Sequence, residues 1–253
     1  MAAAESAPFW QRYLPLDWSL WPAEARLLLT LTAIWSLAGL LVLASASWWV
    51  AAREQAEGAY YLKRQLVWMA ASWSLMSFTA SINLRRWLKL AGPALWIGCL
   101  LIAATLLMGT TVNGASRWLV IGPIQIQPSE LVKPFVVLQA ANLFSHWKRT
   151  RLDQKLLWLA SFGVLVLLIL KQPNLSTAAL TGLLIWLMAF SAGLPLFQLF
   201  GTAIGGALLG TASILINEYQ RLRAISFLNP WKDPQGDGYQ LIQSLLAIGS
   251  GGV

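Results

Sequence analysis

The sequence predicts an all-α fold, a polytopic bundle in which about seven helices cross a membrane. Two features of the composition predict it. Hydrophobic residues make up 57% of the 253 residues and charged residues only 11%, whereas a soluble domain carries about 25% charged residues. The chain also contains 15 tryptophans. Tryptophan favours the membrane–water boundary, which accommodates both its apolar ring and its polar N–H.

Seven apolar runs account for the expected helices, since a spanning helix needs about 20 mostly apolar residues. Residues 1–26 contain Glu5, Asp17 and Glu24 and no compact apolar stretch. We therefore expect a cytoplasmic N-terminal segment there and no cleaved signal peptide. The bundle itself occupies residues 27–216. Its expected helices lie at 27–47, 66–83, 90–108, 128–145, 156–170, 176–192 and 198–216.

A polar stretch from Asn217 to about Gln240 follows the last of these runs. We expect residues 217–253 to form an extracytoplasmic loop and the start of a further apolar segment. The sequence ends at Val253 within that segment and without a polar tail. We therefore also expect the chain to be truncated at its C-terminus.

Basic residues predict the orientation, because lysine and arginine favour cytoplasmic loops. Loops 84–89 and 146–155 are rich in them, which places the N-terminus in the cytoplasm and the loops 109–127 and 217–240 on the outer face, although the whole-chain count of lysine and arginine is close to even between the two sides. The net charge of +8 indicates contact with anionic membrane lipids. Nucleic-acid binding is a poor alternative, because the basic residues are scattered through short loops. Cys99 lies inside an apolar run, so neither a disulfide nor a Cys/His metal site is expected.

The first polar segment of the outer face, residues 113–134, leads into the fourth apolar run. Pro128 suits the first turn of a helix, where its missing N–H costs nothing. Glu130 and Lys133 are three residues apart and so share one helix face. An ionisable residue inside a membrane helix costs about 2.5–3.5 kcal/mol on insertion scales and is a functional-site candidate by default. A structural ion pair that holds helices together is the alternative interpretation.

The second polar segment, residues 171–177, is a tight turn between two apolar runs. Its simplest interpretation is the start of a helix, with Asn174 or Ser176 as the N-cap. Lys171 could in addition contact a phosphate group.

The third polar segment, residues 218–240, concentrates proline, glycine and aspartate, which favour turns. A solvated turn explains one aspartate, but it explains less well why carboxylates alternate with Arg221, Arg223 and Lys232 beside a membrane surface. A carboxylate at such a boundary can act as a general base, and cations near it can bind a diphosphate.

Three stretches therefore occur in order between apolar runs: NGASRWLVIGPIQIQPSELVK, KQPNLSTAAL and YQRLRAISFLNPWKDPQGDGYQLIQSLLAIGSGG. Together they resemble the SEDS family (FtsW, RodA and SpoVE). The resemblance extends from about Leu27 onward and is greater to the division members, FtsW, than to the elongation members, RodA. Members of this family have about ten helices that are long enough to cross a bilayer.

The resemblance implies a function. Family members are peptidoglycan glycosyltransferases that polymerise lipid II into glycan strands at the bacterial inner membrane. Their partner is a class B penicillin-binding transpeptidase (FtsI-like), and the FtsW members act with other divisome proteins in cell division. The resemblance also implies a cytoplasmic N-terminus, in agreement with the charge pattern.

The same resemblance implies site residues. Asp233 matches the essential aspartate of the family's D-P-x-G-x-G-Y-Q motif and would be the catalytic carboxylate. A divalent cation, Mg²⁺ or Mn²⁺, could be shared by Asp233 and the diphosphate of the substrate. Asn174 stands where many relatives have aspartate, so it is given no catalytic role. The expected substrate-binding residues are Glu130, Lys133, Arg117, Arg221, Gln127 and Ser129.

Two other functions are compatible with the same residues. Glu130 and Lys133 inside the membrane would suit the translocation path of a lipid II flippase. A flippase would spread polar residues along a path through the bilayer, whereas the polar motifs of this chain gather at one expected face. A non-catalytic divisome scaffold would need none of the carboxylates.

Overall fold

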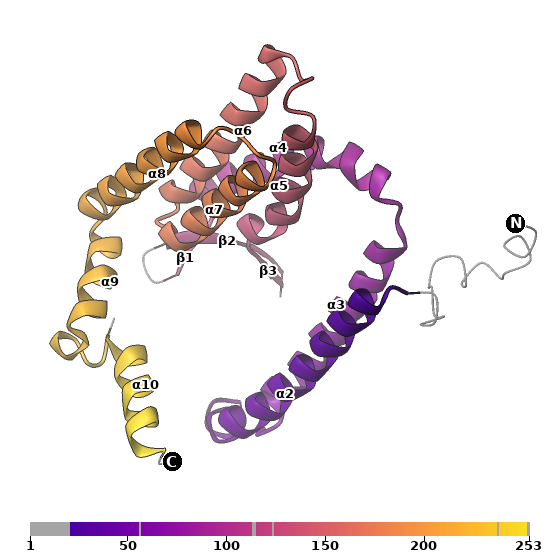
Figure 1. The fold of residues 1–253 in the computed structure, drawn as a ribbon. Coiled ribbons are helices and arrows are strands. Elements are labelled where there is room, and N and C mark those ends of the chain that lie inside the picture. The colour runs from indigo at the N-terminus through magenta and orange to yellow at the C-terminus, as the bar shows by residue number, and fades with distance from the viewer. Residues whose placement is uncertain (1–20, 56, 113–114, 123, 237, 252–253) are drawn as a thin grey trace, which may run out of the picture. The chain divides into compact units, whose positions relative to one another are not determined.

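The computed structural model describes residues 21–55, 57–112, 115–122, 124–236 and 238–251 (Figure 1). Helices dominate the described chain, and each of the seven apolar runs forms a helix within several residues of its expected bounds. The elements are α2 (Ala23–Glu54), α3 (Tyr60–Ser81), α4 (Leu84–Met108), β1 (Thr110–Val112), β2 (Ala115–Ile121), β3 (Ile124–Ile126), α5 (Pro128–Ser145), α6 (Leu152–Lys171), α7 (Leu175–Ser191), α8 (Leu196–Ile216), α9 (Glu218–Leu228), η3 (Pro230–Lys232) and α10 (Tyr239–Ser250).

Four described helices, α2, α4, α6 and α8, are long and apolar enough to cross a membrane. The polytopic helical bundle is thus confirmed, although fewer helices than the expected seven meet this criterion. Helix α7 is apolar but has only 17 residues. Helix α5 has 18 residues, including Glu130 and Lys133, and α3 begins with Lys63 and Arg64 in its first turns. Charge or length therefore sets these three helices apart from the other four.

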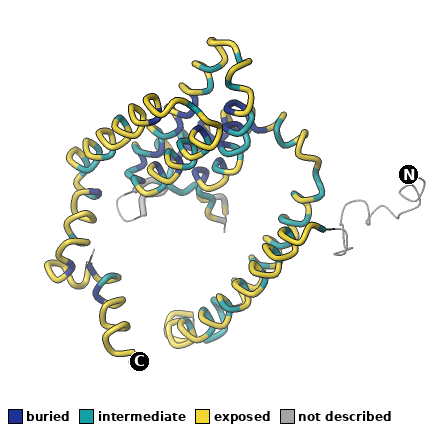
Figure 2. Tube along the Cα trace, in the orientation of Figure 1, coloured by how far each residue is buried: buried dark blue, intermediate teal, exposed yellow. Residues whose placement is uncertain are grey.

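The chain divides into two compact units, Met1–Arg86 and Trp87–Val253. In the first unit, α2 and α3 pack against each other as a helical hairpin. In the second unit, the buried residues concentrate in α4, α5, α6 and α7 (Figure 2). Their apolar core comprises Leu95, Cys99, Ile102, Val132, Val136, Ala140, Leu143, Phe144, Phe162, Leu165, Ile169, Ala178 and Ala189, together with Leu199 of α8.

Close approach between helices fixes parts of this core. A Cβ atom at Gly98 of α4 would lie 2.3 Å from Val132 Cγ2 of α5. The absence of a side chain at Gly98 therefore allows the two helices to approach closely at this point. The indole Nε1–H of Trp186 in α7 donates to the Leu199 carbonyl of α8 over 3.0 Å. Helix α5 thus contacts α4 at Val132, which lies between the predicted site residues Glu130 and Lys133.

A small sheet replaces the polar loop expected at residues 109–127. Strand β2 pairs with β1 and with β3, both antiparallel. Leu119 lies opposite Ile126, and Gly122 turns the chain between the two strands with φ of 59°. β-branched residues favour pleated strands, and Val120 and Ile121 supply them in β2. The all-α prediction did not include this sheet.

The stretch 217–240, expected as a loop, is largely ordered into helix. Asn217 caps α9, since its Oδ1 accepts a hydrogen bond from the Gln220 N–H at 3.4 Å. The short helix η3 follows, and α10 begins at Tyr239. Asp233 lies in the turn between η3 and α10.

Candidate functional site

The N-terminal end of α5, with its N-cap, holds four of the predicted substrate-binding residues, Gln127, Ser129, Glu130 and Lys133. Pro128 occupies the first helical turn, as predicted, and Gln127 is the N-cap residue. The Gln127 Nε2 donates to Ser129 Oγ over 3.2 Å, and Ser129 is fully buried. Lys133 Nζ lies 2.6 Å from Glu130 Oε2, which confirms that the two residues share one face.

The exposures of the two charged side chains differ. The Lys133 side chain is 20% exposed, whereas that of Glu130 is 49% exposed. The ammonium group is thus the more enclosed member of the pair, and its carboxylate partner lies closer to the surface. The pair joins two positions of one helix, so this ion pair does not itself hold α5 to a neighbouring helix. It presents a cation that a carboxylate orients.

Arg117 of β2 connects the three polar segments of the sequence. Its Nε–H donates to the Gln172 carbonyl over 3.2 Å, and its Nη2 donates to the Pro173 carbonyl. Its Cζ also lies 5.6 Å from the centre of the Tyr219 ring in α9. One guanidinium therefore contacts the α6–α7 turn and the first turn of α9.

The α6–α7 turn is itself anchored in the core. The buried Gln172 side chain donates from Nε2 to the Ile102 carbonyl and to Thr105 Oγ1, both in α4. Asn174 caps α7 by accepting from the Thr177 N–H, which confirms one of the two predicted caps. Lys171 is exposed at the end of α6, where a cation interacts favourably with the helix dipole.

Asp233 occupies a turn that two glycines make possible. The Gly236 N–H donates to Asp233 Oδ1 over 3.1 Å, and the Gly238 N–H donates to the Asp233 carbonyl over 3.1 Å. A Cβ at Gly236 would lie 2.1 Å from Asp233 Oδ2, and one at Gly238 would lie 2.1 Å from the Pro230 carbonyl oxygen. The turn therefore folds the Asp233 carboxylate against the Gly236 backbone, while Asp233 remains exposed.

Arg221, the remaining predicted cation, lies near a carboxylate of its own helix. Arg221 Nη2 lies 3.9 Å from Glu218 Oε1, one turn earlier in α9, and both side chains are largely exposed. Arg223 instead contacts Tyr219, with its Cζ 5.8 Å from the ring centre and its Nη1 donating to the hydroxyl over 3.4 Å. Tyr219 is therefore a shared contact of Arg117 and Arg223.

Sequence reasoning did not single out Tyr219, Gln172 or Gln220. The Gln220 side chain is buried and accepts from Ser213 Oγ of α8 over 2.8 Å. A polar side chain is seldom buried without partners, but a single sequence does not show which glutamines are buried. The neighbouring arginines were the only signal that could have pointed to Tyr219.

The donor groups fit a divalent cation only in part. Carboxylate oxygens are the ligands that Mg²⁺ prefers, and Asp233 supplies them. Within the described residues, however, no three His, Cys, Asp or Glu side chains gather closely enough to hold a metal. A cation bound there would need its other ligands from substrate or water.

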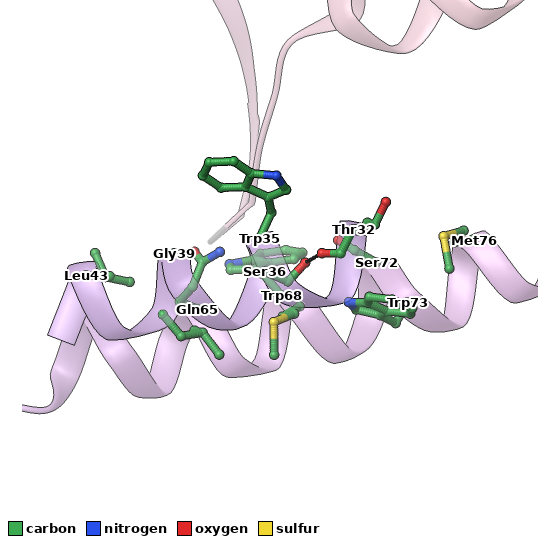
Figure 3. A pocket seen from close by; sticks show the side chains of 12 residues that line it. Thr32, Trp35, Ser36, Gly39, Leu43, Gln65, Trp68, Ser72, Trp73 and Met76 are labelled. Atoms are coloured by element: carbon green, nitrogen blue, oxygen red, sulfur yellow. Dashed lines mark hydrogen bonds between the residues drawn. The ribbon is translucent and has the colours of Figure 1, made fainter. Parts of the chain in front are cut away.

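A separate groove lies between α2 and α3 in the first unit (Figure 3). It has a volume of about 710 Å³, and tryptophan, methionine and serine side chains dominate its walls. The hydroxyl groups of Thr32 and Ser36 donate to carbonyls of their own helix. Its lining contains no ionisable side chain, so the groove offers neither an acid nor a base for group transfer.

Comparisons with known proteins agree with these motifs. Residues 25–253 match the model of the FtsW/RodA/SpoVE family, described as "Cell cycle protein". A "Probable peptidoglycan glycosyltransferase FtsW" of Synechocystis sp. is 45% identical over 92% of this chain and 60% of that protein. One of Aliivibrio salmonicida with the same description is 35% identical over 93% of this chain and 60% of that protein. The chain thus spans less than two thirds of the length of these relatives.

Solved structures show the same likeness. RodA of Thermus thermophilus is 30% identical with a TM-score of 0.54, over 69% of this chain and 58% of that chain. A structure described as "Structural coordination of polymerization and crosslinking by a peptidoglycan synthase complex" matches at 32% identity and a TM-score of 0.61, over 87% of this chain and 65% of that chain. With its four apolar helices, this chain is a membrane-embedded protein and belongs to the FtsW/RodA/SpoVE family.

Proposed function

We propose that this protein is a peptidoglycan glycosyltransferase that polymerises lipid II into glycan strands during cell division. The names of its curated relatives support the activity. The single observation that carries the proposal is the Asp233 turn, in which Gly236 and Gly238 close around an exposed carboxylate. The turn holds the carboxylate through the Gly236 N–H and leaves Asp233 exposed at the surface.

The proposed chemistry needs both a general base and cations. Asp233 takes the proton from the 4-hydroxyl of the acceptor sugar, and that oxygen attacks the anomeric carbon of the donor. The bond from that carbon to the diphosphate oxygen breaks, and undecaprenyl diphosphate leaves with the electron pair. Positive charge grows on the sugar ring in such a transition state, while negative charge grows on the leaving diphosphate.

The positive charge of Lys133 in α5 suits an anionic leaving group such as the diphosphate. Lys133 would face the diphosphate, and Glu130, 2.6 Å away, would hold the ammonium group in place. A helix N-terminus also favours anions, and Gln127 and Ser129 lie at that end of α5. Arg221 is the other cation that we propose for the substrate, whereas the guanidinium of Arg117 is engaged by the carbonyls of Gln172 and Pro173.

The proposed setting is the outer face of a bacterial inner membrane, with the N-terminus in the cytoplasm. The distribution of lysine and arginine between loops supports this orientation. We further propose an FtsI-like class B penicillin-binding transpeptidase as partner, together with other divisome proteins. Support for that partner comes from the matching structure whose description couples polymerisation to crosslinking in one complex.

A lipid II flippase is the second candidate function. The observation that favours it is the Glu130–Lys133 pair inside an otherwise apolar helix, because intramembrane ionisable residues also mark transport paths. A scaffold without chemistry would require neither this pair nor the Asp233 turn.

A vesicle assay with purified lipid II distinguishes these functions. The protein is reconstituted into liposomes, both as this chain and as a chimaera in which C-terminal residues of the Synechocystis relative follow Val253. We expect glycan chains that gel electrophoresis resolves and that lysozyme digests. Monomeric lipid II that crosses the bilayer without forming chains would instead support the flippase. If neither chains nor transport occurs in either version, the proposed function is wrong.

Replacing Gly236 with Ala should lower the polymerisation rate, by about 100-fold if the carboxylate moves by an ångström. The new Cβ would lie 2.1 Å from Asp233 Oδ2, so the acid must leave its present position. The measurement is the initial rate of glycan synthesis at saturating lipid II. Gly249→Ala in α10 is the matched control, because a Cβ there meets nothing within 4 Å. Equal rates for the two variants would show that the turn does not position the acid.

A further inference from the structure

We infer that Arg117 is a positioning residue: by contacting the α6–α7 turn and Tyr219 together, it fixes the direction of α9 and thereby the place of Asp233. This role rests on the proposed function. It differs from direct contact with the diphosphate, since it acts through the protein. The Arg117 side chain contacts one segment 55 residues further along the sequence and another about a hundred residues further along.

The first contact provides a firm anchor. The guanidinium donates to the adjacent carbonyls of Gln172 and Pro173. Gln172 is fully buried, and its side chain bonds to Ile102 and Thr105 of α4. The carbonyls that Arg117 contacts therefore belong to a turn fixed to the helical core.

The second contact connects that anchor to α9. Tyr219 lies in the first turn of α9, with Arg117 Cζ at 5.6 Å and Arg223 Cζ at 5.8 Å from its ring centre. Cations within about 6 Å of an aromatic ring are attracted by its quadrupole. The next residue, Gln220, is buried and accepts from Ser213 of α8. The first turn of α9 is thus held from both the sheet and α8.

Backbone hydrogen bonds connect α9 to the turn that contains Asp233. The Asn229 N–H donates to Ile225 of α9, the Lys232 N–H donates to Asn229, and the Asp233 N–H donates to Pro230. These bonds link the end of α9 to the Asp233 turn without a gap. A tilt of α9 at Tyr219 would therefore displace Asp233, and a misplacement of about 1 Å can cost about 100-fold in rate.

Lysine should not replace Arg117 in this role. Arginine presents a planar fork of donors that also stacks on aromatic rings, whereas lysine carries a point charge on a flexible stem. A residue that merely neutralised a diphosphate would tolerate lysine better. The conservative substitution therefore separates the two roles.

The test combines kinetics with a distance measurement on Arg117→Ala, Arg117→Lys, Tyr219→Phe and Tyr219→Leu, with Arg149→Lys as the control. Spin labels at Ser176 and Ala224, both exposed, report the position of α9 relative to α7 in a background in which Cys99 is replaced by Ala. The distance distribution is recorded in nanodiscs without substrate, so it does not depend on the proposed activity.

Both Arg117 variants and Tyr219→Leu should broaden the distribution and lower kcat at least about tenfold, with KM for lipid II little changed. Tyr219→Phe keeps the ring and should resemble the wild type, as should Arg149→Lys. An unchanged distribution in Arg117→Ala overturns the inference, and so does a raised KM that lysine restores, since that result assigns Arg117 to the diphosphate. A broadened distribution with unchanged kcat also overturns it. If the wild type itself fails to polymerise lipid II, the proposed function fails, while the distance arm still tests whether Arg117 positions α9.

Discussion

Replacing Asp233 with Asn should abolish glycan synthesis while leaving membrane insertion intact. A positioned general base typically contributes about 10²–10⁴-fold to the rate, and an amide cannot take the proton of the acceptor hydroxyl. Asparagine keeps the shape of the side chain and a carbonyl oxygen that can accept from the Gly236 N–H, which now bonds Oδ1 at 3.1 Å. The turn should therefore survive. The measurement is the yield of lysozyme-sensitive polymer from lipid II in proteoliposomes.

Asp153→Asn provides a matched control. Asp153 is an exposed carboxylate at the start of α6, 3.2 Å from Arg151, and its loss should leave polymerisation unchanged. The amount of each variant in the membrane fraction shows whether insertion is affected. Normal chain synthesis by Asp233→Asn would remove Asp233 from the mechanism. Complementation of an FtsW-depleted strain by that variant would support the scaffold function instead.

Replacing Lys133 with Met should also cause a large loss of polymerisation activity. The variant loses a positive charge, and its fold should be less stable. The variant removes a cation proposed for the leaving diphosphate and takes away the ion-pair partner of Glu130. Removing one partner of a fully buried pair costs about 3–5 kcal/mol. The cost should be smaller here, because Glu130 is half exposed. We expect a lower kcat, a higher KM for lipid II and a moderately lower melting temperature in detergent.

The double variant Glu130→Gln with Lys133→Met separates stability from catalysis. It removes both charges and so leaves no unpaired carboxylate, which should restore most of the melting temperature. Polymerisation should stay low if Lys133 acts on the diphosphate. Recovery of both stability and polymerisation in the double variant would mean that the ion pair is purely structural.

The helices could be predicted from sequence because length and apolarity are local properties. Each apolar run became a helix, and α5 begins at Pro128 as its chemistry predicts. The sheet was missed because strands of three to seven residues lie within a stretch interpreted as a loop from its polar residues. The alternation of Ile124, Gln125 and Ile126 after a glycine turn is a hairpin signal that could have revealed β3.

The candidate site likewise has parts that could be predicted from the sequence and parts that could not. The Glu130–Lys133 pair depends only on spacing within one helix, so the sequence predicted it correctly. Arg117 and Gln172 are 55 positions apart, and a single sequence contains nothing that pairs one guanidinium with one carbonyl at that separation. α9 was missed because turn-forming residues dominate the second half of the stretch 217–240, although Asn217 followed by Glu218 is a helix-start signal.

The division of the chain into two compact units bears on its biogenesis. The first unit ends at Arg86, and its two long helices are neighbours in sequence and in contact. Contacts between neighbouring segments form quickly, and the N-terminal part of a protein generally folds first during synthesis. The ribosome can therefore deliver α2 and α3 to the insertion machinery as a paired hairpin, before α4 has left the exit tunnel.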